Sequence, residues 1–363
     1  MVSKNDPGEI YFIHTIDQAS GDSHGYYKIG IVRNERDSEQ RIKEHQTGNP
    51  HRIVTYEILP TKAPMLIEGM LHAKYSEHQV STEWFKFEDE MIKEVIAEAK
   101  RLDEEHGEAV ANMSKHYAIT ASKPERTLTG DDLEKAEKLR DDAFIIERDL
   151  KKHYFLMKKA EHQLEKLTDN HGNGIRGVSV VKITPAKNEF NLATWWKMAS
   201  EDKKKLAGVT QKPKNDFTLL YLQGEEYKKA TAGFWEKAHS KESEETNNAK
   251  VDIPKHKPED FNDTILDRTE EIIKLHEKFC EEKGKHDGKK KELEAKVIQL
   301  MVMCGEHKGI KDICSWEREQ PSELKANESL MKKNFAEDLT DPTYFKESKT
   351  KASITVHPFR PYA

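Results

Sequence analysis

Two short runs rich in β-branched and aromatic residues, at 9–16 and 26–32, place the strongest constraint on how this chain folds. They contain "IYFIHTI" and "YYKIGIV", which are typical of β-strands because strands favour Ile, Val and Tyr. The connector "DQASGDSHG" is polar and contains glycine, which suits a hairpin with a longer loop. We therefore predict that the first part of the chain folds as a hairpin.

The residues that follow extend this hairpin into a compact domain, predicted to span residues 8–104. Helical and strand patterns alternate there, as in an α/β unit with a small antiparallel sheet. The predicted elements are a helix at 37–46, a strand at 52–59, a helix at 63–75, a strand at 82–87 and a helix at 89–104.

One long helix is predicted at 133–167, within a segment 130–168 that follows a polar linker at 105–129. Its apolar positions are spaced four and three residues apart in turn, which is a heptad pattern with one polar interruption. The positions are Leu139, Ala143, Ile146, Leu150, His153, Met157, Ala160, Leu164 and Leu167. This seam could join two copies of the chain in a homo-oligomer, or it could pack within one copy.

The remainder, 169–363, is predicted to be a mainly helical accessory domain, so the fold class is α+β. We expect a solvated loop at about 240–260 and two helices near 262–283 and 288–304. The formal net charge of −6 argues against capture of nucleic acid by overall charge, so local clusters must hold any polyanion.

The cellular setting is expected to be cytoplasmic. No apolar run approaches the roughly 20 residues that cross a bilayer, and the first residues lack the apolar stretch of a signal peptide. Cys280, Cys304 and Cys314 fit a reducing compartment, in which thiols stay free. A zinc site formed by Cys304, His307 and Cys314 would have an uncommon spacing and would need a fourth ligand.

The N-terminal domain offers each residue type that phosphodiester hydrolysis needs. A base must activate water, a cation must neutralise the phosphate, and a carboxylate must hold a divalent metal. Tyr11 and Lys28 lie on the paired strands, Arg41 and His45 are one helical turn apart, and Glu68 interrupts the apolar run "MLIEGML". Singly, each also has a structural interpretation, such as a packed tyrosine or a solvated helix face. A buried carboxylate, however, needs a partner, a metal or water.

The order of these elements resembles a GIY-YIG nuclease domain of the T5orf172 or Mug113 type. The resemblance covers residues 9–87 and is carried by "EIYFI", "YYKIG", "QRIKEHQTGNP", "MLIEGMLHAKY" and "STEWFKF". It implies a DNA endonuclease of bacterial or phage type that depends on a single Mg²⁺ or Mn²⁺ ion.

The resemblance also implies roles for individual residues. Tyr11 corresponds to the tyrosine that acts as general base or positions water, and Arg41 to the arginine that holds the scissile phosphate. His45 matches a histidine of some members, Glu68 is the metal ligand, and Gly30 ends the second motif. Lys28 occupies the place of the second-motif tyrosine and could accept a proton or bind phosphate.

Two further features depart from the family pattern. Glu9 stands where the first motif begins with glycine, and no clear asparagine follows the last strand. DNA contacts are expected from Tyr27, Arg33, Lys43 and Arg52, supported by the C-terminal half. That half is similar to the region following the core of YqaJ-type phage recombination exonucleases, on segments such as "GEEYKKATAGFWEKAHS" and "TVHPFRPY".

Two other functions remain open. The domain could bind DNA without cutting it, in which case replacing Glu68 would leave DNA affinity intact. Alternatively, the chain could be a defence or anti-defence factor that acts through protein contacts along 133–167, and it would then show no salt-sensitive DNA binding.

Overall fold

The structure is a computed structural model of the 363-residue chain. It describes residues 7–33, 38–47, 51–117, 119, 123–168, 171–210, 214–221, 232–251, 253, 259, 261–319 and 324–362.

An antiparallel sheet of five strands forms the N-terminal domain, in the order β3-β1-β2-β5-β4. The strands are β1 (Gly8–Ile16), β2 (Ser23–Arg33), β3 (Arg52–Thr61), β4 (Gln79–Ser81) and β5 (Trp84–Lys86). The four predicted strands are confirmed, and β4 is an additional short edge strand. Register pairs Tyr11 with Gly30 and Lys28 with Ile13.

Helices cover both faces of this sheet. Helix α1 (Ser38–Gln46) places Ile42 against one face, together with Tyr11, Ile13, Val32 and Ile53. Helices α2 (Pro64–Lys74) and α3 (Asp89–Tyr117) cover the other face. The core on that side contains Phe12, Tyr27, Ile29, Leu66, Leu71, Phe85 and Ile92.

Helix α3 continues to Tyr117, so the first half of the expected linker is helical. Leu102, His106, Val110 and Met113 recur at intervals of four, four and three residues and are all buried. Charged residues between these positions make the segment look polar in the sequence. In the structure the buried stripe packs on α9 (Glu270–Cys304), and this packing stabilises the additional helical turns.

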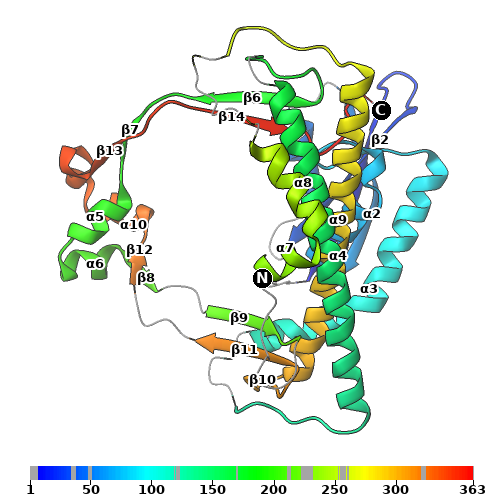
Figure 1. Cartoon of the computed structure of the whole chain (residues 1–363), viewed down its shortest axis with the longest axis vertical. Coiled ribbons are helices and arrows are strands. Elements are labelled where there is room, and N and C mark those ends of the chain that lie inside the picture. The colour runs from blue at the N-terminus through cyan, green and yellow to red at the C-terminus, as the bar shows by residue number, and fades with distance from the viewer. Residues whose placement is uncertain are drawn as a thin grey trace.

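The long helix α4 (Asp131–Thr168) is confirmed, and its seam packs within the chain. It runs antiparallel to α9, because Asp142 pairs with Lys296 at 2.9 Å and His153 with Glu282 at 2.7 Å (Figure 1). The seam residues Leu139, Ala143, Met157, Ala160 and Leu164 are buried.

Helix α9 is one continuous helix where two were predicted. Its segment "EKGKHDGKK", between the two predicted helices, contains two glycines and packs closely against α2 and the short 3₁₀ helix η1 (Ser76–His78). A Cβ atom on Gly284 would collide with the Ser76 hydroxyl, and one on Gly288 would lie 3.7 Å from the Ala73 Cβ. Tertiary packing therefore compensates for the low helix propensity of glycine.

The expected loop at 240–260 is largely a helix. Helix α8 (Ser240–Val251) packs on α4, where Thr246 donates to the Phe155 carbonyl at 2.8 Å and Lys159 pairs with Glu245 at 2.6 Å. It follows α7 (Ala232–Ala238), and residues 222–231, which include the part of the segment "GEEYKKATAGFWEKAHS" that precedes α7, lie outside the described residues.

A small lobe stands apart from the α4–α9 pair, and a two-stranded ribbon leads to it (Figure 1). We call β6 (Ser179–Thr184) with β14 (Lys351–Val356) the upper arm, and β9 (Lys214–Leu219) with β11 (Cys314–Glu319) the lower arm. Strand β10 (Gly309–Ile310) pairs with β11. The distal lobe comprises β7 (Asn188–Phe190), α5 (Leu192–Met198), α6 (Glu201–Ala207), β8 (Gly208–Thr210), β12 (Leu324–Ala326), α10 (Glu328–Asn334), η4 (Ala336–Thr340), η5 (Pro342–Tyr344) and β13 (Phe345–Glu347).

The distal lobe has a small core of its own, made of Trp195, Ala207, Met331 and Phe335. In the main body, the Cys304 and Cys314 sulfur atoms lie 3.4 Å apart, while His307 hydrogen-bonds the Pro124 carbonyl. Within the described ranges, no cluster of three metal-ligating side chains is found, and no helix is long and apolar enough to cross a membrane.

Candidate active site

The Tyr11 hydroxyl and the His45 Nε2 atom form the centre of the site, 3.0 Å apart. Tyr11 comes from the middle of β1 and His45 from the last turn of α1, which lies on the same sheet face. Burial, with a contribution from the Glu83 carboxylate, raises the pKa of Tyr11 to about 12. Burial, together with Lys28 and Arg41, lowers the pKa of His45. At neutral pH the pair is therefore a phenol beside a neutral imidazole.

Gly30 provides the space for the Tyr11 ring. The two residues are cross-strand partners, and a Cβ atom at position 30 would overlap the Tyr11 hydroxyl and ring carbons. The glycine of the second motif is thus required for the position of Tyr11 rather than for a turn.

We expect Gly30→Ala to displace Tyr11 and to lower the free energy of unfolding by about 1–3 kcal/mol, the usual range for overpacking. Urea denaturation followed by tryptophan fluorescence measures the loss. Gly233→Ala is the matched control, since a Cβ atom there meets nothing within 4 Å. An unchanged unfolding midpoint for Gly30→Ala would show that the sheet accommodates the methyl group and that our account of Gly30 is wrong.

Arg41 lies one turn before His45 on α1 and is the cation of the site. Its charge acts to lower the pKa of the Tyr11 hydroxyl, and its guanidinium pairs with Glu44 at 2.7 Å. Its side chain keeps 39% of its surface exposed, so a phosphate oxygen from solvent can reach it. A planar guanidinium with several donors is well suited to that contact.

Glu68 projects from the middle of α2 at the edge of this cluster. Burial, reinforced by the Glu83 carboxylate, raises the pKa of Glu68 to about 7, although Lys28, Lys291 and Arg33 act in the opposite direction. Within the described part of the chain, Glu68 makes no hydrogen bond or ion pair. A half-buried carboxylate without a direct partner is costly, and a bound cation would relieve that cost.

The structure adds Glu83, which we did not single out from the sequence. It precedes β5, and its carboxylate forms an ion pair with the buried Lys28. Burial alone would raise the pKa of Glu83. The hydrogen bond and the charge of Lys28 together outweigh burial, so this pKa is lowered. Glu83 could have been found from the sequence by the same criterion as Glu68, because it is an acidic residue next to an apolar segment, "WFKF".

His72 is a second addition, one helical turn after Glu68. Its Nε2 atom donates to the Ile29 carbonyl of β2 at 3.1 Å, and burial lowers the pKa of its ring. This neutral histidine ties α2 to the strand that carries Lys28 and Gly30, and it thereby fixes the height of Glu68 relative to the sheet.

Helix α1 is held in register by Glu9, the residue that departs from the family pattern. The Ser38 hydroxyl, at the first residue of α1, donates to the Glu9 carboxylate. The preceding residue, Gly8, is the one that lies against the neighbouring strand, since a Cβ atom there would collide with the Val32 carbonyl.

Tyr27 must be corrected as a DNA-contacting residue. It is 1% exposed, its hydroxyl donates to Asp89, and its ring lies in the core under α2 and α3. Side chains alternate between the faces of a strand, so Lys28 shares the face of Tyr11 and Tyr27 cannot. Arg33, Lys43 and Arg52 are exposed.

The donor set fits a magnesium ion bound mainly through substrate and water. Mg²⁺ commonly takes one or two carboxylates from a protein and completes its octahedron with water and phosphate oxygens. Glu68 supplies one such carboxylate, and the Glu83 carboxylate, although paired with Lys28, acts on it electrostatically. A single protein ligand is also consistent with the lack of a three-residue metal cluster in the described chain.

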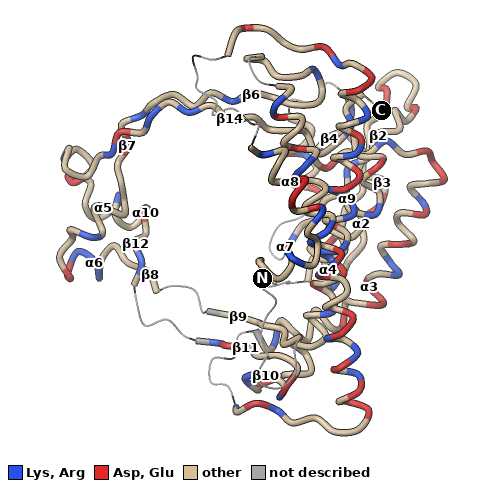
Figure 2. Tube along the Cα trace, viewed as in Figure 1, with Lys and Arg blue, Asp and Glu red and all other residues tan. Residues whose placement is uncertain are grey.

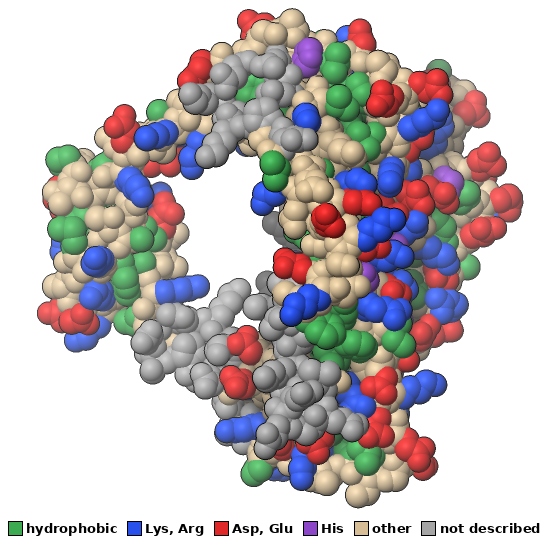
Figure 3. Space-filling view, viewed as in Figure 1, with side chains coloured by type: hydrophobic (Ala, Val, Ile, Leu, Met, Phe, Trp, Pro, Cys, Tyr) green, Lys and Arg blue, Asp and Glu red, His purple; other side chains and the backbone are tan. Residues whose placement is uncertain are grey.

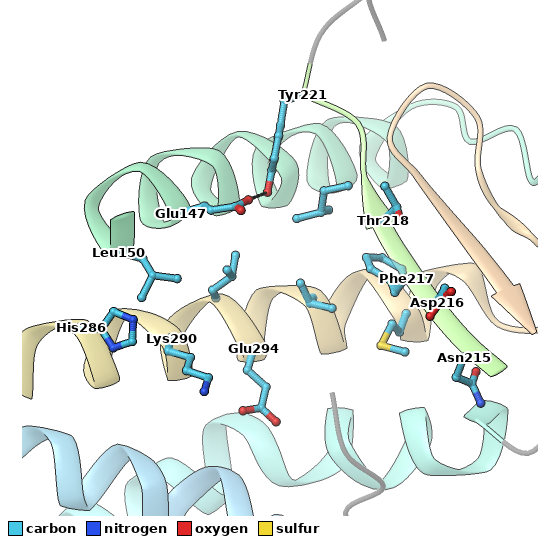
Figure 4. Close-up of a pocket in the computed structure, with 14 residues that line it drawn as sticks. Glu147, Leu150, Asn215, Asp216, Phe217, Thr218, Tyr221, His286, Lys290 and Glu294 are labelled. Atoms are coloured by element: carbon cyan, nitrogen blue, oxygen red, sulfur yellow. Dashed lines mark hydrogen bonds between the residues drawn. The ribbon is translucent and has the colours of Figure 1, made fainter. Parts of the chain in front are cut away.

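Several cavities outside this cluster involve α9. One, of about 400 Å³, lies between α2 and α9 and is bordered by Gly69, His72, Lys283 and Lys291. Another, of about 660 Å³, lies between α4, α9 and β9, and its lining includes Leu293, Val297 and Met301. Tyr221 donates a hydrogen bond to Glu147 at its border (Figure 4). None of its lining residues comes from the N-terminal domain, so it is separate from the site of Tyr11.

Comparison with known proteins assigns the N-terminal domain. Residues 8–100 match the family model of the T5orf172 domain. The chain carries a T5orf172 domain. This domain is related to the GIY-YIG nuclease-like folds, as the order of β1, β2, α1 and α2 indicated. The match covers about a quarter of the chain.

The comparisons extend no further. No curated protein and no solved structure matches the chain. The similarity of the C-terminal half to YqaJ-type exonucleases therefore has no support from them.

Proposed function

We propose that the protein is a metal-dependent DNA endonuclease whose T5orf172 domain hydrolyses a phosphodiester bond. One observation carries this proposal: the hydroxyl–imidazole pair of Tyr11 and His45, the cation of Arg41 and the half-buried carboxylate of Glu68 converge at one edge of a T5orf172 domain. These groups are the base, the phosphate ligand and the metal ligand that such hydrolysis needs.

In the proposed mechanism, Arg41 binds a non-bridging oxygen of the scissile phosphate and neutralises its charge. Tyr11 orients the attacking water, and its hydroxyl passes the proton of that water to His45 Nε2. His45 accepts it because its lowered pKa keeps the ring neutral at the working pH. A magnesium ion held by Glu68 would supply Lewis-acid stabilisation of the leaving oxygen.

Lys28 has a positional role in this scheme rather than that of a base. Its ammonium group is engaged by Glu83, which fixes both side chains next to Tyr11 and Glu68. The ion pair is buried on the Lys28 side, so removal of one partner would leave an uncompensated charge in the site.

The decisive experiment compares cleavage of supercoiled and linear duplex DNA by the wild type and by Glu68→Gln, with Mg²⁺ or Mn²⁺. We expect cutting by the wild type and a loss of at least about 100-fold in the variant, because the metal ligand is removed and the shape is kept. Glu90→Gln is the matched control, since its side chain is 85% exposed on the first turn of α3.

Two results would contradict the proposal. Equal cutting by Glu68→Gln and wild type would place the activity elsewhere. No cutting by the wild type on any DNA form, combined with unchanged DNA affinity in Glu68→Gln, would assign the domain to DNA binding without catalysis.

A further inference from the structure

The cavity of about 400 Å³ between α2 and α9 lies beside the candidate active site. Its wall includes Gly69 and Thr82, which are the chain neighbours of Glu68 and Glu83. His72, which ties α2 to β2, also lines it. The volume falls in the range of ligand-binding sites, roughly 300–1,000 Å³. A group bound in this cavity is therefore close to the two carboxylates of the site.

The opposite wall of the cavity comes from α9, a helix outside the T5orf172 domain. Lys283, Lys290 and Lys291 line it from this side, and Asp287 is the acidic residue of the described lining. His72 is neutral because burial lowers the pKa of its ring. Three ammonium groups and one carboxylate give this lining an excess of positive charge, in a chain whose formal net charge is −6.

The surrounding surface has no such excess. Figure 2 shows Lys and Arg interleaved with Asp and Glu along α3, α4 and α9, and Figure 3 shows the two signs mixed over the visible face of this body. A surface of mixed sign does not produce a broad field that attracts a polyanion. A phosphate group must therefore bind where cations are in local excess, as they are in the cavity.

Lys290 is the most accessible cation of the cavity. Its side chain is exposed and forms no ion pair with any residue that the structure describes. Figure 4 shows it extending from α9 away from Glu147 and Leu150 of α4. Lys283, by contrast, is paired with Asp287. Lys290 can therefore bind an anion without breaking an ion pair of the described protein.

Lys291 connects the cavity to Glu68. A Cβ atom at Gly69 would overlap the Lys291 Cε atom, so the lysine stem lies against the turn of α2 that carries Glu68. Burial raises the pKa of Glu68, and the charge of Lys291 is one of those that oppose this effect. The ammonium pairs with Glu294 at 2.8 Å and lies 3.4 Å from the Met65 carbonyl. Since an ammonium group has three donors, one remains for a phosphate oxygen.

Two hydroxyl groups add hydrogen-bonding capacity to the lining. The side chains of Ser76 and Thr82 border the cavity and make no hydrogen bond with the described residues. The Ser76 hydroxyl occupies the space that a Cβ atom on Gly284 would need. The Gln79 amide donates to the Thr82 carbonyl at 2.6 Å and so holds the turn that carries Thr82. Lysine ammonium and hydroxyl groups together are typical ligands of backbone phosphates.

We propose that this cavity binds backbone phosphates next to the scissile one, with Lys290 and Lys291 as the cationic ligands. The proposal rests on the proposed function for the identity of the anion as DNA. Tyr11, Arg41 and His45 do not line the cavity, so the phosphates that it binds are neighbours of the one that is cut. Helix α9 thereby completes the DNA-binding surface of a domain more than 200 residues away in the sequence.

The test measures the affinity of Glu68→Gln for a short labelled DNA duplex in EDTA, over a range of salt concentrations, so that cutting plays no part. In this background, Lys290→Ala with Lys291→Ala should reduce the slope of log affinity against log salt by about 2, one unit for each lysine. The control is Lys274→Ala with Lys278→Ala, which removes the same charge from exposed positions of α9 that do not line the cavity.

Three results would overturn the proposal. Equal changes of slope in the two double variants would show that only the overall charge matters. An unchanged slope without Lys290 and Lys291 would show that they do not contact phosphate. Binding by the parent protein that does not depend on salt would show that the anion is not DNA.

Gly69→Ala tests the position of Lys291 without removing its charge. The added methyl group should displace the Lys291 ammonium and reduce the slope by about 1, while urea denaturation confirms that the variant is folded. In Lys291→Ala the space is already empty, so adding Gly69→Ala should cause no further change. A further decrease would show that position 69 acts independently of Lys291 and that this lysine is wrongly placed as a phosphate ligand.

Cleavage assays separate this proposal from the proposed function. With Glu68 present and Mg²⁺ added, the loss of Lys290 and Lys291 should raise the KM for DNA by about 10-fold, more than it lowers kcat. An unchanged KM in a protein that cuts would contradict the cavity and leave the catalysis standing. The expected change of slope in a protein that never cuts would support the cavity and contradict the catalysis.

Discussion

Replacing Tyr11 by phenylalanine, or His45 by alanine, is expected to slow DNA cleavage by about 10²–10³-fold, the range typical of a lost proton-transfer group. The hydroxyl and the Nε2 atom are 3.0 Å apart and act on one proton, so neither is effective alone. We therefore expect the double variant to be no slower than the worse single variant. Single-turnover rates at saturating DNA measure this directly.

Tyr56→Phe is the control for this pair. Tyr56 lies on β3 against the ring of Tyr27, away from the Tyr11 cluster, so the loss of its hydroxyl should leave the rate unchanged. Multiplying effects of the Tyr11 and His45 substitutions would show that they act in separate steps. A full rate in Tyr11→Phe would remove the hydroxyl from the mechanism.

Glu68→Gln is expected to stabilise the metal-free protein at pH 8 while it abolishes cutting. The folded-state pKa of Glu68 is about 7 and the ordinary value is 4.5, so the folded state resists ionisation. Below pH 4.5 the Glu68 carboxyl therefore does not lower the free energy of unfolding of the wild type. That free energy falls as the pH rises from 4.5 toward 7, and above pH 7 the full loss is present. The penalty to the free energy of unfolding is on the order of 3 kcal/mol.

Urea denaturation of both proteins between pH 5 and 8 in EDTA measures this difference. The gap should widen with pH, and added Mg²⁺ should close it by stabilising the wild type alone. Glu90→Gln should show no pH-dependent gap. A constant gap, or one that narrows as the pH rises, would mean that the Glu68 environment does not disfavour its charge.

The candidate site was partly readable from the sequence because its members sit in strong local patterns. Glu68 interrupts an apolar run, and Arg41 and His45 share a helix face by their spacing. Local patterns could not show whether Tyr27 or Lys28 lies on the same face of the sheet as Tyr11. The strand register decides which of these two neighbours does so. Glu83 was missed because its function depends on Lys28, 55 residues away.

The helices show the same division. The heptad pattern of 133–167 allowed a partner from a second chain or from the same one, and α9 supplies it from the same chain. Two helices were predicted where α9 is continuous, and Gly284 of α9 gives the room that Ser76 of η1 occupies.

The sequence by itself determined the hairpin, the α+β class and the T5orf172 domain, and it picked out Tyr11, Arg41, His45 and Glu68, because each of these stands in a local pattern or a short motif. Only the tertiary structure decided the role of Glu83, the antiparallel α4–α9 pair and the two strand arms. The arms depend on pairing between segments more than 90 residues apart, such as Lys214–Leu219 with Cys314–Glu319. Such pairing depends on the packing of the whole body, which no short window of sequence contains.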